Sequence, residues 1–143
     1  MISPLTNLKH YYENFDQASF ETLTDIYADD VVFTDPLHKI CGVKTLKQYF
    51  IGTCSNLTYC KFIFTDEIIG EHSACLLWRM EYCHGSLKNN ARLSLVGNSV
   101  VQFTDGKVTS QEDFYDMGAM VYEHIPLLGG AIRMIKTRIA KAA

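Results

Sequence analysis

The sequence predicts an α+β fold in which N-terminal helices cover one face of an antiparallel sheet. Apolar residues recur at helical spacing over residues 3–51, whereas from Leu57 onward long aromatic and β-branched stretches favour strands. Helices followed by one run of strands are typical of α+β domains. A long sheet must bury one face, and the leading helices are the available cover. If such a sheet curls strongly, the space beneath it becomes a pocket.

Three N-terminal helices are expected. Ser3 followed by Pro4 is typical of an N-cap and a first helical position, and predicts a helix over residues 3–16. Ser19 is expected to cap a second, short helix. Residues 43–51 carry apolar side chains on one side and form the third.

Four long strands are expected in the second half of the chain. They cover residues 59–65, 74–83, 92–104 and 107–116. The segment Thr104-Asp-Gly-Lys107 is typical of a hairpin turn between the last two. Gly97 inside the third strand indicates a bulge or bend. In the last strand, alternation places Gln111, Asp113 and Tyr115 together on one face.

Composition indicates one soluble domain over residues 1–143, with a core at about 5–116 and a helical extension over 117–143. A net charge of −3 argues against nucleic-acid binding. Five cysteines without CxxC spacing predict free thiols in a reducing cytoplasm. The first residues lack the pattern of a signal peptide, and no apolar run reaches membrane-spanning length. We therefore expect a cytoplasmic protein.

The stretch over residues 27–42 holds the first candidate site residue. A short apolar strand, Val31-Val32-Phe33, runs into Asp35-Pro36. Pro36 has no N–H and biases Asp35 toward an extended backbone, so the strand ends there. Asp-Pro is also ordinary turn chemistry. Asp35 is therefore either a turn residue or a carboxylate at the mouth of the pocket.

The order of elements over about residues 5–116 resembles the nuclear transport factor 2-like superfamily, a cone of curved sheet closed by helices. The segment Tyr27-Ala-Asp-Asp30, three residues, Asp35-Pro36 and a loop to Gly42 is similar to the ketosteroid isomerase segment that supplies the general base. The resemblance implies that Asp35 is that base. Counted back from Tyr27, it implies that Tyr11 is the tyrosine that donates to the developing oxyanion.

The same resemblance implies which side chains contact the substrate. They are Trp78, Met80, Tyr82, Ser99, Gln111 and Tyr115. Ser99 is a departure, because it stands where the isomerase has a protonated Asp that donates a hydrogen bond, and a hydroxyl is a weaker acid. Asp113 could replace that donor from the neighbouring strand, since a carboxyl in an apolar pocket prefers its neutral form. Asp113 is therefore a third catalytic candidate.

Other members with the same fold imply other chemistries. SnoaL-like cyclases have an acid/base Asp that resembles Asp116, although Asp116 also suits a turn or cap where the chain leaves the sheet. Limonene epoxide hydrolase relies on an Asp-Arg-Asp set, which Asp35, Arg92 and Asp113 would supply. From the residues alone, Tyr11 is equally well a core aromatic on an amphipathic helix.

The expected function is acid/base catalysis on an apolar carbonyl-containing substrate by an isomerase, cyclase or dehydratase. We expect no cofactor and no metal, because the sequence has no Gly-rich phosphate loop, nucleophile elbow or metal-ligand cluster. An alternative is a binding module that holds an apolar ligand without turnover. From the residues alone, Trp78 and Met80 are more typical of a core, and only the cone model makes them line a pocket.

Two expectations concern partners. Superfamily members commonly dimerise through the outer face of the sheet, and Leu77, Cys83 and Phe114 lie opposite the pocket face here, which predicts a homodimer. In the extension, a helix over residues 131–140 follows the break at Gly129-Gly130 and is basic and amphipathic. We expect it to dock on the body or on the partner subunit. The competing expectation is contact with an anionic membrane surface.

Overall fold

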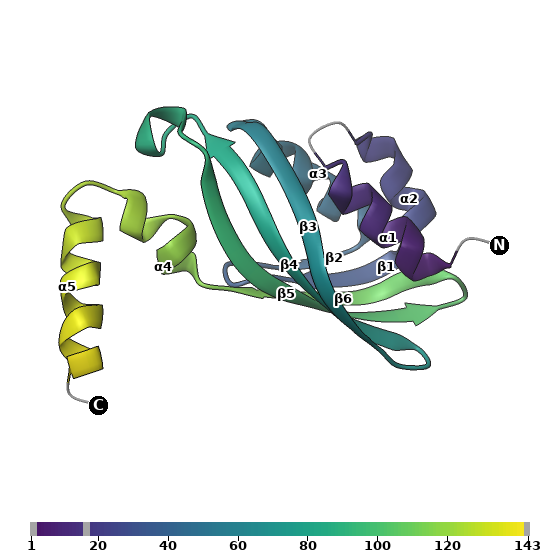
Figure 1. Cartoon of the computed structure of the whole chain (residues 1–143). Helices are drawn as coiled ribbons and strands as arrows, with labels where there is room; N and C mark the ends of the chain where they lie inside the picture. Colours follow the sequence, from purple (N-terminus) through teal and green to yellow (C-terminus); the bar gives the residue numbers. More distant parts are fainter. Residues whose placement is uncertain (1–2, 16–17, 142–143) are drawn as a thin grey trace.

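The computed structural model describes residues 3–15 and 18–141, and it confirms the predicted fold class. Six strands form one curved, unclosed sheet in the order β2-β1-β6-β5-β4-β3. In Figure 1, helices α1, α2 and α3 lie together against one face of this sheet, while α4 and α5 extend beyond its end. The core lies between the first three helices and the sheet.

The three N-terminal helices lie where the sequence predicts them. They are α1 (Pro4–Glu13), α2 (Leu23–Ile26) and α3 (Val43–Cys54). The Ser3 hydroxyl accepts a hydrogen bond from the N–H of Thr6 at 3.2 Å, which confirms the N-cap. The predicted end of the first helix, Asp16, lies outside the described residues. Ser19 caps a 3₁₀ turn, η1 (Phe20–Thr22), that leads into α2.

All four long predicted strands and the short strand predicted at residues 31–33 are present, and β2 joins them. The six are β1 (Tyr27–Thr34), β2 (Lys39–Cys41), β3 (Leu57–Ile69), β4 (Ser73–His84), β5 (Leu93–Thr104) and β6 (Lys107–Tyr115). Asp105 and Gly106 both have positive φ angles, of 52° and 79°, which confirms the tight hairpin between β5 and β6. The loop expected after Asp35 contains β2, which pairs back onto β1.

The prediction of a wholly antiparallel sheet is wrong at one pair, because β1 runs parallel to β6. These two strands are joined through the whole of β2 to β5, so no hairpin imposes an antiparallel direction on them. In their register Phe33 lies opposite Gln111, and Thr34 lies opposite Glu112. Because of this parallel register, the residues that follow β1 lie near Asp113.

Gly97 is not at a bulge, contrary to the sequence-based interpretation. It lies in regular register between Trp78 on β4 and Tyr115 on β6. A Cβ atom at this position would lie 2.4 Å from Cη2 of Trp78 and 2.7 Å from the Phe114 carbonyl oxygen. Glycine is needed here because the Trp78 ring occupies the space of a side chain. The irregularity in β5 lies instead between Gln102 and Phe103.

The C-terminal extension begins at the end of the sheet and continues away from it (Figure 1). It comprises α4 (Met117–Met120), η3 (Tyr122–His124) and α5 (Leu128–Lys141). The sequence predicts that Gly129 and Gly130 form a break before the last helix. They lie instead in the first turn of α5. Gly129 packs so closely on the carbonyl of Glu123 that an added Cβ would lie 2.2 Å from its oxygen. Over the described residues, no helix is both long and apolar enough to span a bilayer.

The outer face of the sheet exposes apolar side chains. Leu77 is 37% exposed, Phe114 is 46% exposed and Val96 is 72% exposed. Leu77 and Phe114 flank Asn98 on adjoining strands, so they belong to one surface. The homodimer expected from this face stays a prediction.

We expect Phe114→Lys to dissociate that dimer, because a lysine would leave a charge facing the apolar surface of the partner. Sedimentation velocity over a range of concentrations measures the change. Ile139→Lys is the control, since Ile139 is also an exposed apolar side chain, at 67%, but lies on α5 and not on the sheet. A parent chain that sediments as a monomer throughout would contradict the prediction.

We expect Gly97→Ala to lower the free energy of unfolding by about 1–3 kcal/mol, because the new methyl group must displace the Trp78 ring. Urea unfolding measures it. In Gly52→Ala the added Cβ would meet nothing within 4 Å inside helix α3, so this control should be neutral or slightly stabilising. Equal stability of the two variants would refute the steric argument.

Candidate functional site

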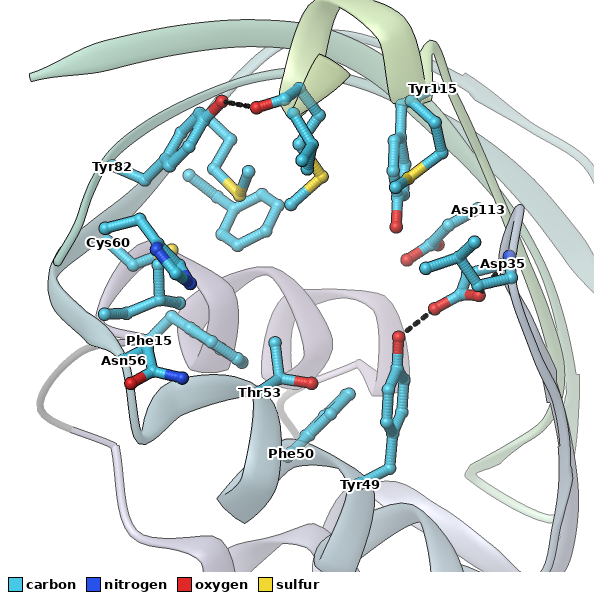
Figure 2. A pocket seen from close by; sticks show the side chains of 18 of the residues that line it. Phe15, Asp35, Tyr49, Phe50, Thr53, Asn56, Cys60, Tyr82, Asp113 and Tyr115 are labelled. Carbon is cyan, nitrogen blue, oxygen red and sulfur yellow. Dashed lines mark hydrogen bonds between the residues drawn. The ribbon is translucent and has the colours of Figure 1, made fainter. Parts of the chain in front are cut away.

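A cavity of about 480 Å³ lies between the sheet, helices α1 and α3, and the start of the extension. Figure 2 shows side chains converging on it from these elements. Its lining is mainly aromatic, with Tyr12, Phe15, Phe33, Tyr49, Phe50, Phe62, Trp78, Tyr82 and Tyr115. Among the described lining residues the only carboxylates are Asp35 and Asp113, and none is Lys or Arg. The site is therefore an apolar cavity with two acidic groups.

Asp35 combines both roles that the sequence left open. Its N–H donates to the carbonyl of His38 at 2.9 Å, and its Oδ1 accepts from the N–H groups of Leu37 at 2.9 Å and His38 at 2.8 Å. This is the turn chemistry of an Asp before proline. Asp35 is also 8% exposed and lines the cavity. The turn thus holds the carboxylate in place at the cavity wall.

Tyr49 is the site residue that sequence reasoning missed. Its hydroxyl donates to Oδ2 of Asp35 (Figure 2). Burial raises the pKa of Tyr49, and the hydrogen bond to Asp35 raises it further, so the hydroxyl stays protonated and donates. The available signal was its place beside Phe50 on the apolar face of α3, the helix that follows the Asp35 loop. His38 packs on the Tyr49 ring, with ring centroids 4.9 Å apart.

Asp113 is held by a buried polar network. Its Oδ1 accepts from the Ser99 hydroxyl at 2.6 Å and from Nε2 of Gln111 at 2.9 Å. Behind these, Nε1 of Trp78 donates to Ser99 at 2.9 Å, and the Tyr27 hydroxyl donates to Gln111 at 2.6 Å. Ser99 and Gln111 do not line the cavity, in contrast to the contact that the resemblance implies. They position Asp113 from behind.

Burial raises the pKa of Asp113 from its ordinary value of 3.8 to about 6. The hydrogen bonds from Ser99 and Gln111 lower it, because they favour the carboxylate, and the charge of Asp35 raises it again. Loss of solvent is the largest of these effects. Asp113 therefore changes its protonation state in the range where many enzymes work.

Tyr11, the tyrosine implied as oxyanion donor, is not among the residues that line the cavity. Its hydroxyl is buried and has no hydrogen-bond partner among the described residues, and burial raises its pKa to about 12. Tyr12 lines the cavity instead, and its hydroxyl lies 2.8 Å from that of Tyr27. Counting back from Tyr27 therefore selects Tyr11, whereas its neighbour Tyr12 is the residue that reaches the cavity.

Tyr115 carries the hydroxyl most available to a ligand. In Figure 2 it points toward Asp35 and Asp113. Burial and the charges of these two carboxylates raise its pKa, so it remains a hydrogen-bond donor. It makes no hydrogen bond within the part of the chain that the structure describes. Its free donor and the carboxylates form one polar end of the cavity.

The remaining candidates divide between the cavity and the surface. Trp78, Met80 and Tyr82 line the cavity as expected. The Tyr82 hydroxyl also donates to the carbonyl of Met120 at 2.6 Å, which ties α4 to the sheet. Arg92 stacks on the ring of Tyr59 instead, with its guanidinium carbon 4.1 Å from the ring centroid, so no Asp-Arg-Asp set is assembled.

Asp116 acts as the N-cap of α4. Its Oδ1 accepts from the N–H of Gly118 at 2.8 Å, and this bond is the main reason that its pKa is lowered. Its other oxygen lies 3.4 Å from Nζ of Lys136. Asp116 is exposed and is not among the cavity-lining residues. The cap interpretation of this residue therefore fits the structure.

The sequence that forms this sheet, these helices and this cavity matches a known family. Residues 8–111 match the model of the SnoaL-like domain, and the chain belongs to that family. No curated protein matches the chain.

Solved structures show the same fold at low sequence identity. A nuclear transport factor 2-like protein of unknown function from Burkholderia pseudomallei superposes with a TM-score of 0.73 and 16% identity, covering 85% of this chain and 96% of that one. A protein with a ketosteroid isomerase-like fold from Catenulispora acidiphila, in complex with trimethylamine, superposes with a TM-score of 0.72 and 10% identity, covering 82% of this chain and 89% of that one. A SnoaL-like polyketide cyclase from Jannaschia gives 0.72 and 7%, covering 82% and 88%.

The pKa of Asp113 predicts a pH dependence of stability. The folded state keeps the Asp113 proton up to about pH 6, whereas an unfolded chain releases it near 3.8, so stability falls as pH rises through this window. Between pH 4 and pH 7, we expect the free energy of unfolding of Asp113→Asn to rise by about 3 kcal/mol relative to that of the parent. This figure follows from a pKa difference of roughly two units at about 1.4 kcal/mol each. Urea unfolding at several pH values measures this difference.

Asp30→Asn is the matched control, because the Asp30 side chain is exposed on β1. The difference in the free energy of unfolding between Asp30→Asn and the parent should not rise between pH 4 and pH 7. A pH-independent difference for Asp113→Asn would show that the folded state does not retain the proton.

Proposed function

We propose that this SnoaL-like protein is an acid/base enzyme, of the isomerase, cyclase or dehydratase type, acting on an apolar carbonyl-containing substrate. The supporting observation is the pair of carboxylates, Asp35 and Asp113, at one end of an aromatic cavity (Figure 2). Their surroundings differ, because Asp35 accepts hydrogen bonds from a turn and from Tyr49, whereas burial raises the pKa of Asp113. Two acids in different environments suit separate base and acid roles.

The charge of the lining favours a neutral substrate. The described lining includes two acidic side chains and no Lys or Arg, so only His38 and His84 could carry a positive charge opposite a carboxylate or phosphate. Aromatic rings and aliphatic side chains supply the apolar surface, which suits an apolar ring or chain. A ketone or enone satisfies both conditions, since its one polar atom is a neutral oxygen that needs a hydrogen-bond donor.

Asp35 is the proposed base. Its Oδ1 is occupied by the N–H groups of Leu37 and His38, whereas Oδ2 accepts one bond, from Tyr49. A carboxylate oxygen has two lone pairs, so Oδ2 keeps one for the proton of a carbon next to the carbonyl. The turn and Tyr49 fix the direction of that lone pair, which limits the motion needed for proton transfer.

Tyr115 and Asp113 are the proposed donors to the substrate oxygen. Removal of the proton moves negative charge onto the carbonyl oxygen, and positioned donors stabilise that charge. The Tyr115 hydroxyl is unoccupied among the described residues and points to the polar end. Asp113 can donate in its neutral form, which predominates below about pH 6. This assignment gives Tyr115 the role that the resemblance implied for Tyr11, and it keeps Asp113 as the second donor.

A binding module for an apolar ligand is the second candidate. The observation in its favour is that Asp35 already accepts hydrogen bonds from Leu37, His38 and Tyr49, as a purely structural turn residue would. In that case the cavity would hold its ligand without turnover.

We expect Asp35→Asn to lower turnover of an enone by about 10²–10⁴-fold, because an amide cannot accept the substrate proton. Ligand binding should persist, since the cavity shape is kept. Asp29→Asn, exposed on β1, the strand that ends just before Asp35, is the control and should match the parent. Steady-state kinetics on a panel of enones, with binding followed by tryptophan fluorescence of Trp78, measures both. Binding without turnover by the parent on every member would favour the binding module.

A further inference from the structure

Helix α5 presents an apolar stripe with no partner among the described residues. Ile135 is 54% exposed, Ile139 is 67% exposed and Met134 is 58% exposed, and Leu127 just before the helix is 93% exposed. Leu128, Ile132, Ile135 and Ile139 recur at helical spacing along one side. Figure 1 shows this helix standing off the end of the sheet. The stripe therefore faces outward rather than toward the core.

The same helix concentrates positive charge on a chain of net charge −3. From Leu128 to Lys141 it has four cations and no acidic residue. Arg133 donates to the carbonyl of Glu123 at 2.6 Å, and Lys136 lies 3.1 Å from the Glu123 carboxylate. These two cations fasten the helix to the rest of the extension. Arg138 and Lys141 make no ion pair with any described residue.

One of the unpaired cations, Arg138, borders the apolar stripe. Arg138 lines one surface hollow together with Met134, Ile135 and Ile139. A helix with aliphatic residues on one side and cations at the border is suited to lie in the plane of a membrane interface, where the apolar side enters the acyl boundary and the cations meet anionic headgroups. Charge complementarity thus identifies the kind of surface that covers this stripe.

A second copy of the chain fits the stripe less well. A stable protein interface needs about 800 Å² and roughly 20–30 residues from each partner. Helix α5 has 14 residues, with its apolar side chains in a single narrow row. Burial at a bilayer surface needs only that row, because the lipid supplies the remaining contacts. The outer face of the sheet is the better candidate for contact between copies.

We propose that α5 is an interfacial helix that docks the protein on an anionic lipid bilayer. The helix is tied through Lys136 to Asp116, and α4 begins at the next residue. Met117, Met120 and Val121 of this segment line the cavity. Docking therefore brings the cavity wall close to the membrane, so that an apolar substrate enters from the lipid. This last step rests on the proposed function, whereas the docking itself does not.

The experiment is co-sedimentation of the full chain with vesicles of phosphatidylcholine, with and without phosphatidylglycerol, at low and high salt. The parent should bind the anionic vesicles, more weakly at high salt. Ile135→Asp with Ile139→Asp, and separately Arg138→Glu with Lys141→Glu, should each weaken binding by about tenfold or more. All four side chains are exposed, so the melting temperatures should match the parent.

Ile69→Asp and Lys44→Glu are matched controls, because Ile69 is 61% exposed at the end of β3 and Lys44 is exposed on α3. Both should bind as the parent does. No binding of the parent to anionic vesicles, or equal loss in the controls, would overturn the proposal. Self-association of the parent that Ile139→Asp abolishes would also overturn it, in favour of a second copy on α5. The binding assay uses no turnover, so failure of the enzyme proposal leaves its result unaffected.

Discussion

The parallel pairing of β1 with β6 is the constraint on which the site depends. It joins the first strand of the chain to the last, and its register places Phe33 beside Gln111. The next inward-facing residues along the two strands are Asp35 and Asp113, so the same pairing brings two carboxylates to one end of the cavity. Each alone would be a turn residue or a buried acid. Burial raises the pKa of Asp113, the charge of Asp35 adds to this effect, and the two carboxylates together create a polar end in the cavity.

Burial of Asp113 is tolerated because a network of hydrogen bonds satisfies it. Ser99 and Gln111 donate to one carboxylate oxygen, and they are themselves held by Trp78 and Tyr27. A buried polar group without partners is costly, so these contacts offset part of the loss of solvent, while Oδ2 accepts no hydrogen bond from the described residues. The network also explains why the strands carry polar side chains on their inner face. Their contribution is to hold an acid in position.

The extension belongs to the site as much as to the surface. Its first helix closes part of the cavity and is tied to the sheet by Tyr82, whose hydroxyl donates to Met120. Its last helix is fastened to η3 and to the residue before α4 through Arg133, Lys136 and the close packing of Gly129 on Glu123. One end of the extension thus lines an apolar cavity, while the other displays an apolar stripe with cations. The arrangement suits a protein whose ligand and whose docking surface are both apolar.

Local features followed from the sequence alone. The Ser3 cap, the hairpin at Asp105-Gly106, the alternation of faces in β6 and the position of Asp35 at a strand end depend on residues within a few positions of one another. The remaining features depend on distant neighbours, and periodicity indicates which face a side chain occupies but not what it meets there. For this reason the parallel pairing, the bond from Tyr49 to Asp35, the choice of Tyr12 over Tyr11 at the cavity, and the space for Trp78 at Gly97 became visible only in the folded chain.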